Sequence, residues 1–242
     1  LKMTKESAIK QMRYWSVMFV ALLACSVYAD DEIPGASPTM TIFANDSTQI
    51  TDSYEGSAPV KATFNANAAG YEGYSPIYEW RFFDSENSET PFLVRYEENT
   101  EYTFDESGSF SIQLYISFVN GTDTVEFSQE TPFTISISSS KLEIPNAFSP
   151  NGDGQNDVFR VKEGHQSIVS FHGYIFNRWG KKIYDWTDIN GGWDGTINGH
   201  DAKAGVYYVI IKARGADGRN YNLRRDVNLL RGYESSDSGN RQ

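Results

Sequence analysis

Residues 110–119 read FSIQLYISFV, and this stretch decides the fold class. Large apolar side chains occupy every second position, with mostly small or polar residues between them. Successive side chains of a strand point to opposite faces, so a period of two places one apolar face against a core. The stretch therefore predicts a β-strand with one buried face, made by Phe110, Ile112, Leu114, Ile116 and Phe118.

The segments around this strand have the same character. Asn120-Gly121 is a turn signal, and no segment shows the 3.6-residue period of an amphipathic helix. Short strands separated by turns predict an antiparallel β-sandwich. The further expected strands are residues 40–43, 60–65, 77–83, 124–127 and 133–137.

A hairpin is expected near the end of the sequence. Residues 206–213 and 221–229 alternate in the same way, and Ala216-Asp217-Gly218-Arg219 separates them. Asp-Gly between alternating runs predicts a turn whose two central residues both have φ > 0. The chain is thus expected to be all-β, with two immunoglobulin-like antiparallel β-sandwich domains in tandem after a signal peptide.

Composition limits the function classes. The 242 residues include 15 Tyr, 15 Phe and 5 Trp, enough aromatic side chains to build cores and to exclude wholesale disorder. A net charge of −11 disfavours binding to nucleic acid or to anionic membranes, because both are polyanions. A single cysteine, Cys25, excludes a disulfide framework and a multi-cysteine zinc site, and three scattered histidines form no metal centre by themselves. At most, an oxygen-ligated ion is expected.

The first 29 residues resemble a secretory signal peptide. Basic residues precede an apolar run at 14–24, and Val27-Tyr28-Ala29 is a small-x-small cleavage site, so cleavage is expected after Ala29. The run is too short for a spanning helix, and no second run follows it. In an alternative route, Leu22-Leu23-Ala24-Cys25 is a lipobox and Cys25 is lipidated. Soluble cleavage is the favoured route.

Charge divides the rest of the chain. Residues 30–140 contain 19 acidic and 3 basic side chains, whereas residues 141–242 contain 12 and 14. Such a change indicates a domain boundary near residue 140. The expected organisation is a linker at 30–38, a sandwich at 39–140, a second domain at 141–232 and a polar, disordered tail at 233–242.

The first domain resembles the PKD-type immunoglobulin-like domain of extracellular proteins. The resemblance rests on an apolar strand, a W-x-F strand, a Y-x-F strand and a glycine-led strand in the family's order, found at residues 58–64, 78–82, 102–104 and 107–114. Phe83-Asp84-Ser85 departs from the family's Gly-Asp-Gly turn. The resemblance implies a spacer or binding module without catalysis.

The second domain contains five distinctive motifs: IPNAFSPNGDGQNDVF at 144–159, IFNRWG at 175–180, GWDG at 192–195, GVYY at 205–208 and VNLLR at 227–231. With these motifs in this order, it closely resembles the gliding motility-associated C-terminal domain, the type B sorting domain of the type IX secretion system in Bacteroidetes. The resemblance implies an address that carries the protein through a translocon to the cell surface or beyond.

Residues 151–157, NGDGQND, permit two interpretations. Oxygen-bearing side chains among glycines are the ingredients of a Ca²⁺ loop, with Asn151, Asp153 and Asp157 as ligands. The closing glutamate and the flanking helices of an EF-hand are missing. The same residues also suit a turn whose side chains accept hydrogen bonds from their own backbone. Both interpretations stay open at this stage.

Three tryptophans spaced seven residues apart could form a sugar-stacking platform or part of a core. We expect Trp179 and Trp193 to be buried and Trp186, between polar neighbours, to be exposed. His200-Asp201 and the acidic run 97–101 could each be read as catalytic groups, but no nucleophile has a motif around it. The sequence therefore predicts no enzyme activity.

Two functions remain. The first is a non-enzymatic exported envelope or surface protein with a display or binding module and a sorting domain. The second is a glycan-binding accessory module of an envelope polysaccharide system, lipid-anchored at Cys25. For either function, the protein is expected outside the cell or on the outer-membrane surface. Where no type IX system exists, it is expected in the periplasm. Coplanar exposed aromatic rings on one sandwich face would favour the second function, and a polar, acidic face the first.

Overall fold

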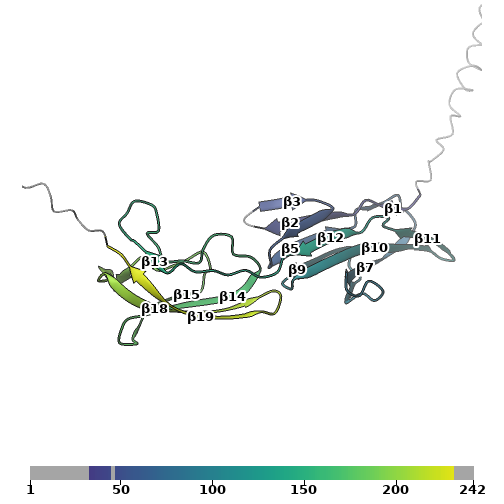
Figure 1. The fold of residues 1–242 in the computed structure, drawn as a ribbon. Helices are drawn as coiled ribbons and strands as arrows, with labels where there is room; N and C mark the ends of the chain where they lie inside the picture. The colour runs from purple at the N-terminus through teal and green to yellow at the C-terminus, as the bar shows by residue number, and fades with distance from the viewer. Residues whose placement is uncertain (1–32, 45–46, 232–242) are drawn as a thin grey trace, which may run out of the picture. The chain divides into compact units, whose positions relative to one another are not determined.

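A computed structural model describes residues 33–44 and 47–231, and this part of the chain contains strands and turns but no helix (Figure 1). The all-β prediction is confirmed. Within the same residues, no helical segment has the length and hydrophobicity needed to cross a membrane. Cleavage after Ala29, lipidation of Cys25 and the tail at 233–242 all concern residues outside the described ranges. The described residues from Pro34 onward form one compact unit.

Two sheets and a two-stranded ribbon make up the first half. One sheet has the order β3-β2-β5-β9, and the other has the order β4-β12-β10-β7-β8 with β11 also paired to β10. The ribbon joins β1 to β6, so Gly35 and Ala36, assigned to a linker by composition, are paired residues. The strands are β1 (Gly35–Ala36), β2 (Thr39–Ala44), β3 (Ser47–Ile50), β4 (Ser53–Gly56), β5 (Val60–Asn65), β6 (Ala68–Ala69), β7 (Ser75–Asp84), β8 (Leu93–Arg95), β9 (Asn99–Phe104), β10 (Gly108–Asn120), β11 (Asp123–Ser128) and β12 (Phe133–Ile137).

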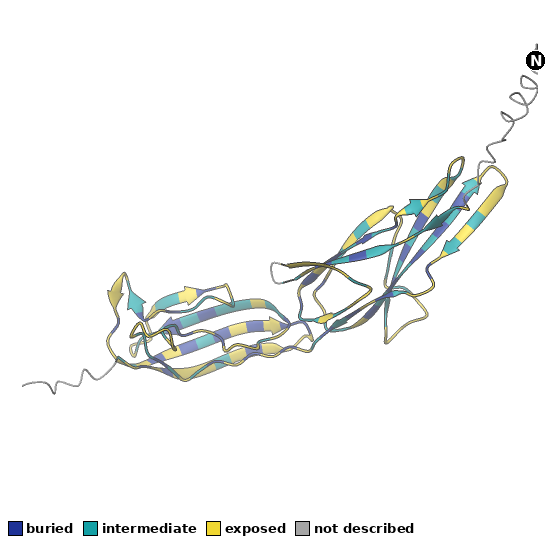
Figure 2. Ribbon diagram, turned by 90° about the horizontal axis from the view of Figure 1, so that it is seen from above, coloured by how far each residue is buried: buried dark blue, intermediate teal, exposed yellow. Residues whose placement is uncertain are grey.

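Strand β10 contains the stretch with which the sequence argument began. Its alternate residues from Phe110 to Phe118 are buried, as predicted, and the same alternation of burial runs along its neighbours (Figure 2). One edge of β10 pairs with β7. The other edge pairs with β12 over residues 108–112 and with β11 over residues 115–120. This thirteen-residue strand therefore serves two partners on one side.

The core of the first half lies between its two sheets. Phe64 of β5 contacts rings of the opposite sheet, with centroid distances of 5.7 Å to Trp80, 5.4 Å to Phe82 and 6.0 Å to Phe133. The indole Nε1 of Trp80 donates a hydrogen bond to the Glu98 carbonyl at 3.3 Å, so its polar atom is satisfied. These aromatic contacts join the two sheets across the sandwich.

The second half contains one five-stranded sheet, β13-β19-β18-β14-β15, and the ribbon β16–β17. Loops and the ribbon cover one face of the sheet, where side chains such as Phe159 and Trp193 are fully buried. The opposite face carries no described layer. The strands are β13 (Ala147–Phe148), β14 (Ile168–Phe176), β15 (Lys182–Trp186), β16 (Thr196–Ile197), β17 (His200–Asp201), β18 (Gly205–Gly215) and β19 (Asn220–Leu229).

The predicted hairpin is β18–β19, but its turn differs from the prediction. Only Gly218 has a positive φ, 76°, whereas Asp217 does not. The turn closes through hydrogen bonds from Gly215 N to Arg219 O and from Gly218 N to Gly215 O. The Asp217 carboxylate also accepts bonds from Arg219 N and from Ser140, which holds Asp217 in place without a left-handed backbone. The expectation of a positive φ at both central residues was wrong, because hydrogen bonds to the Asp217 side chain fix the turn instead.

Candidate functional site

The loop at residues 151–157 is organised around one carboxylate. Asp157 Oδ1 accepts hydrogen bonds from the backbone N–H groups of Asn151 at 2.9 Å and Gly152 at 2.7 Å, and Oδ2 accepts one from Gly154 at 2.8 Å. These bonds, led by that from Gly152, lower the pKa of Asp157. Gly152 and Gly154 both have positive φ, so the glycines provide the backbone shape that aims the N–H groups inward.

The other two candidate ligands are also engaged within the loop. Asn151 Oδ1 accepts a bond from Asp153 N at 3.1 Å, and Asp153 Oδ1 accepts one from Gln155 N at 2.8 Å. Asp153 Oδ2 accepts a bond from Asn151 Nδ2 at 2.9 Å. Within the described ranges, no group of three or more His, Cys, Asp or Glu side chains is arranged to hold a metal. The geometry fits the self-capping turn, and calcium binding by this loop stays a prediction.

The loop gives a testable pH dependence. We expect Asp157→Asn to lower the melting temperature at pH 7, because an amide cannot replace a carboxylate that accepts three N–H groups. The lowered pKa of Asp157 means that its contribution is present above its ordinary pKa and is lost as the pH falls through the lower folded value. Melting curves between pH 2 and 7 should therefore be flatter for Asp157→Asn.

The calcium interpretation is tested on the unsubstituted chain. Equal melting temperatures in millimolar Ca²⁺ and in chelator would exclude the calcium site. A melting temperature that falls in chelator by as much as it falls in Asp157→Asn would support the site.

Two of the three tryptophans lie where they were not expected. Trp193 is fully buried, as predicted, but Trp186 is only 7% exposed and Trp179 is 81% exposed. In β15, Asp185 and Trp186 point to opposite faces, so a polar neighbour does not indicate exposure of the ring. Trp179 lies in the turn between β14 and β15. The three rings therefore form no common platform.

The GWDG motif at 192–195 builds part of the second core. Trp193 exchanges backbone hydrogen bonds with Phe159, and its Nε1 donates to the Thr196 carbonyl at 2.7 Å. A Cβ at Gly192 would lie 2.5 Å from the Phe159 carbonyl oxygen, which explains why this position requires glycine. Asp194 Oδ1 accepts bonds from Thr196 N and Oγ1 and so fixes the following turn. The motif is structural in this fold.

The two groups of residues that could be read as catalytic lie on exposed segments. His200 and Asp201 lie in the exposed strand β17, and Asp201 pairs with Arg231 at 3.1 Å. Glu97 and Glu98 are exposed ahead of β9, and Glu101 pairs with Lys61 at 2.8 Å. No described serine or cysteine stands beside these groups in a hydrogen bond. The solvated-loop and strand-end interpretations fit these positions.

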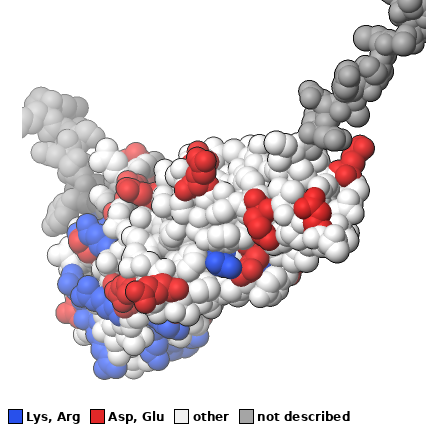
Figure 3. Space-filling view, turned by 90° about the vertical axis from the view of Figure 1, so that its right-hand side faces the viewer, with Lys and Arg blue, Asp and Glu red and all other residues white. Residues whose placement is uncertain are grey.

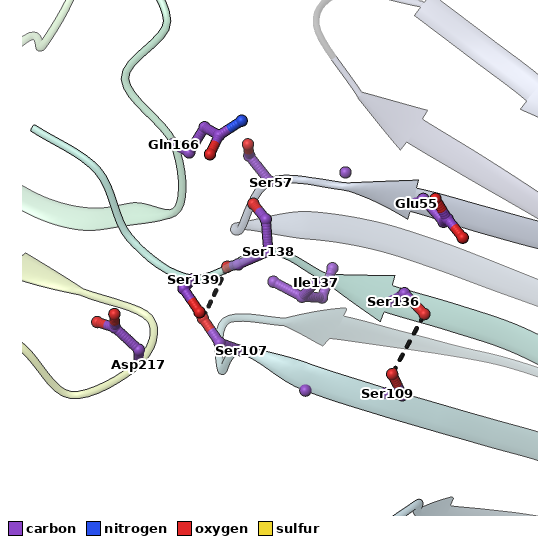
Figure 4. A pocket seen from close by; sticks show the side chains of 12 residues that line it. Glu55, Ser57, Ser107, Ser109, Ser136, Ile137, Ser138, Ser139, Gln166 and Asp217 are labelled. Atoms are coloured by element: carbon purple, nitrogen blue, oxygen red, sulfur yellow. Dashed lines mark hydrogen bonds between the residues drawn. The ribbon is translucent and has the colours of Figure 1, made fainter.

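A groove of about 710 Å³ is lined by residues of both halves (Figure 4). Its hydroxyl groups bond to neighbours within the wall: Ser107 Oγ donates to the Ser138 carbonyl at 2.8 Å, and the Ser109 and Ser136 hydroxyls are 3.3 Å apart. The lining contains no histidine, cysteine or lysine that could act as base or nucleophile. Its residues are Glu55, Gly56, Ser57, Ser107, Gly108, Ser109, Ser136, Ile137, Ser138, Ser139, Gln166 and Asp217.

Asp217 has a role that the sequence did not reveal. Its carboxylate accepts bonds from Ser140 Oγ at 2.7 Å and Ser140 N at 3.1 Å, and the Ser140 and Tyr221 hydroxyls are 2.9 Å apart. These bonds, led by that from the Ser140 hydroxyl, lower the pKa of Asp217. The predicted boundary segment is thus attached to the β18–β19 turn. Sequence spacing gave no signal for this pair because 77 positions separate the two residues.

The charge division of the sequence is visible on the molecular surface. On the face drawn in Figure 3, most Lys and Arg side chains gather in one region, where Asp and Glu also occur, and the rest of the face carries scattered Asp and Glu among uncharged residues. The basic side chains come mainly from the second half, which holds 14 of the 21 in the chain. An acidic half and a near-neutral half are therefore distinct in their surface chemistry.

Comparison with known proteins gives one informative match. The model of the CHU_C Type IX secretion signal domain matches residues 142–224. No curated protein matches the chain. Among solved structures, the crystal structure of dimeric latent PorU from Porphyromonas gingivalis is similar over 84% of this chain, at 13% identity and a TM-score of 0.27. The chain spans about a fifth of PorU, 21%, and a likeness at this TM-score supports no argument.

The matched region coincides with the sheet, loops and core of the second half. It starts at Leu142, the first buried residue of that core, and ends within β19. The resemblance found from the five motifs is thereby confirmed for the sorting domain. Such a domain implies an exported or cell-surface protein. Over residues 142–224, the second half of this chain is therefore similar to the CHU_C Type IX secretion signal domain.

Proposed function

We propose that this chain is a non-enzymatic surface or envelope protein, in which the first half is a PKD-like display or binding module and residues 141–242 are the address read by a type IX translocon. The CHU_C match over residues 142–224 supports the export part of this proposal. The final location is the cell surface or the medium in a host that has the translocon, and the periplasm in one that lacks it.

The exposed surface of the first half supports display over carbohydrate binding. Its exposed large apolar residues are dispersed: Phe43 is on β2, Ile50 on β3 and Ile77 on β7, and Phe92 and Tyr96 flank β8. A sugar-stacking surface needs coplanar rings on one face, and these residues do not form such a row. The surrounding charge is strongly acidic, with 19 acidic side chains in residues 30–140. A glycan-binding accessory role therefore remains the second candidate.

A transfer experiment tests the address. Residues 141–242 are fused to a foreign periplasmic protein in a host with a type IX system, and residues 34–140 are fused to the same protein as a matched control. We expect only the first fusion to be digested when protease is added to intact cells. Equal protection of both fusions would contradict the proposal, and the second half would then be a structural or partner-binding domain.

A further inference from the structure

The uncovered face of the second-half sheet, here called the outer face, has an unusual composition. Side chains of β14, β18 and β19 alternate, so those opposite the core project from this face. Every one of them is at least partly exposed. From one end to the other, the rows across the three strands are Ser170–Arg214–Asn220, His172–Lys212–Asn222, Tyr174–Ile210–Arg224 and Phe176–Tyr208–Asp226, followed by the pair Val206–Asn228.

One end of the outer face is apolar. Phe176 pairs across the strands with Tyr208, and Tyr174 pairs with Ile210. Tyr208 is 44% exposed and Val206 is 42% exposed. Aromatic and aliphatic groups that share an exposed sheet face form a contiguous patch, and such a patch indicates an interaction surface. The aliphatic members favour a protein partner, since a sugar would stack on rings alone.

The other end is basic and lacks partners. Arg214 and Lys212 lie two residues apart on β18, about 7 Å along the strand, and Arg224 is diagonal to Lys212 on β19. Among the ion pairs of the described residues, none includes these three side chains. Like charges held this close repel one another, so the cluster costs stability unless an anionic partner neutralises it.

The acidic groups of the face do not offset this cluster. Asp185 already pairs with Lys182 at 2.9 Å and with His172 at 3.1 Å. Asp226 lies opposite Tyr208 and two residues after Arg224 on β19, and among the described residues no ion pair joins Asp226 to Arg224. The face therefore presents an apolar zone beside a positive zone, a surface complementary to an apolar patch flanked by carboxylates.

An exposed tryptophan stands next to the apolar end. Trp179 lies three residues after Phe176, in the β14–β15 turn, and is 81% exposed. Asn177 Oδ1 accepts bonds from the N–H groups of Trp179 and Lys181, both at 3.0 Å, which holds the turn in one shape. The Arg178 guanidinium lies 5.6 Å from the Trp179 ring centroid. A rigidly held, solvated Trp–Arg pair has the composition of an interface hot spot.

We infer that the outer face and Trp179 together form the surface that the export machinery binds. The partner is a protein whose contact surface has an apolar centre for Trp179, Phe176 and Tyr208 and carboxylates for Lys212, Arg214 and Arg224. This inference rests on the proposed function, because it names the part of the address that is read. The export machinery would then recognise the outer face of the folded sheet and the β14–β15 turn.

Two variants of the full chain test the inference in a host with a type IX system. Trp179→Ala removes a ring that contributes nothing to the core, and Lys212→Glu/Arg214→Glu/Arg224→Glu reverses the positive zone. Each should reduce the protease-accessible fraction on intact cells by about tenfold or more, because hot-spot contacts dominate such interfaces. The matched controls are Tyr96→Ala, at a 67% exposed ring, and Arg95→Glu/Arg160→Glu/Lys203→Glu, at three exposed residues that also form no ion pair among the described residues. The protease-accessible fraction of both controls should stay within about twofold of that of the unsubstituted chain, because charges at the rim of an interface or far from it contribute little to binding.

Other outcomes separate the inference from the proposed function. Circular dichroism and melting curves of the purified chains verify that each variant is folded. If the unsubstituted chain stays inside, the proposed function fails and the inference falls with it. If the chain and both folded variants are exported equally, only the inference is overturned. Retention on heparin-agarose that the triple variant loses, with export unchanged, would also overturn it and assign the face to an anionic polysaccharide.

Discussion

A chain that ends at residue 140 is expected to fold and yet to remain in the periplasm of a host with a type IX system. The first half has its own core, in which Phe64, Trp80 and Phe82 join the two sheets. Truncation removes the whole region that matches the secretion signal domain, residues 142–224. The expected effect is a near-complete loss of surface exposure with little loss of the folded first half.

The cost of truncation to folding can be bounded from the contacts that it removes. Among the described residues, six hydrogen bonds join the first half to the removed residues. Ala58 N donates to Ser167 Oγ at 3.2 Å, Ser107 N donates to the Ala216 carbonyl at 3.1 Å, and the Ser138 and Ser167 hydroxyls are 3.0 Å apart. The other three join Ser140 to Asp217 and Tyr221, and Ser140 becomes the solvated end of the truncated chain. Each hydrogen bond contributes about 1 kcal/mol, so the loss is at most about 6 kcal/mol against a typical stability of about 5–15 kcal/mol. The truncated chain should therefore be less stable than the full chain and still fold around its own core.

Fractionation measures both parts of this prediction. Protease is added to intact cells and to lysed cells, and the truncated and full-length chains are compared at equal expression. The truncated chain should be digested only after lysis, and its resistant core should match that of the full chain. Surface digestion of both chains to the same extent would show that residues 141–242 are not the address. Degradation of the truncated chain in every fraction would instead show that the first half depends on the second.

The fold class was predictable because it depends on local alternation. The buried set from Phe110 to Phe118 followed from a period of two alone. The division of one β10 edge between β11 and β12 was not predictable, because both partners return from downstream and local patterning does not choose between them. The predicted turn type at Asp217-Gly218 failed because Ser140, far away in sequence, supplies the bonds that fix Asp217.

The candidate site, like the fold, was predictable where local sequence determines it and not where distant residues do. The motifs identified the sorting domain. The loop at 151–157 permitted two interpretations, and its hydrogen bonds have the self-capping geometry, whereas calcium binding stays a prediction. The outer face was missed, although residues 206–213 contained a signal for it. Val206, Tyr208 and Ile210 are apolar like the residues between them, so neither face of that strand reads as purely solvated. Its cationic cluster depends on cross-strand register, which the sequence did not specify.

The three tryptophans provide the largest expected effect on stability. Trp186 packs against the rings of Phe171, Tyr184 and Phe159, with centroid distances of 5.7, 5.9 and 6.4 Å. Trp186→Ala should therefore destabilise the second half by about 3–5 kcal/mol. For a domain of about 100 residues this is a fall in melting temperature of more than about 10 °C. Differential scanning calorimetry of the full chain measures the shift.

Two matched variants make the comparison specific to this ring. Trp186→Phe keeps an aromatic ring and removes an Nε1–H that is buried without a hydrogen-bond partner among the described residues, so it should cost much less than the alanine variant. Trp179→Ala should change the stability by no more than about 0.5 kcal/mol, because exposed side chains contribute little. A melting temperature lowered more by Trp179→Ala than by Trp186→Ala would restore the assignment expected from neighbouring polarity and contradict the strand alternation of β15. The order Trp186→Ala, Trp186→Phe, Trp179→Ala, from largest to smallest effect, follows from the burial of each ring and from how much of the ring is removed.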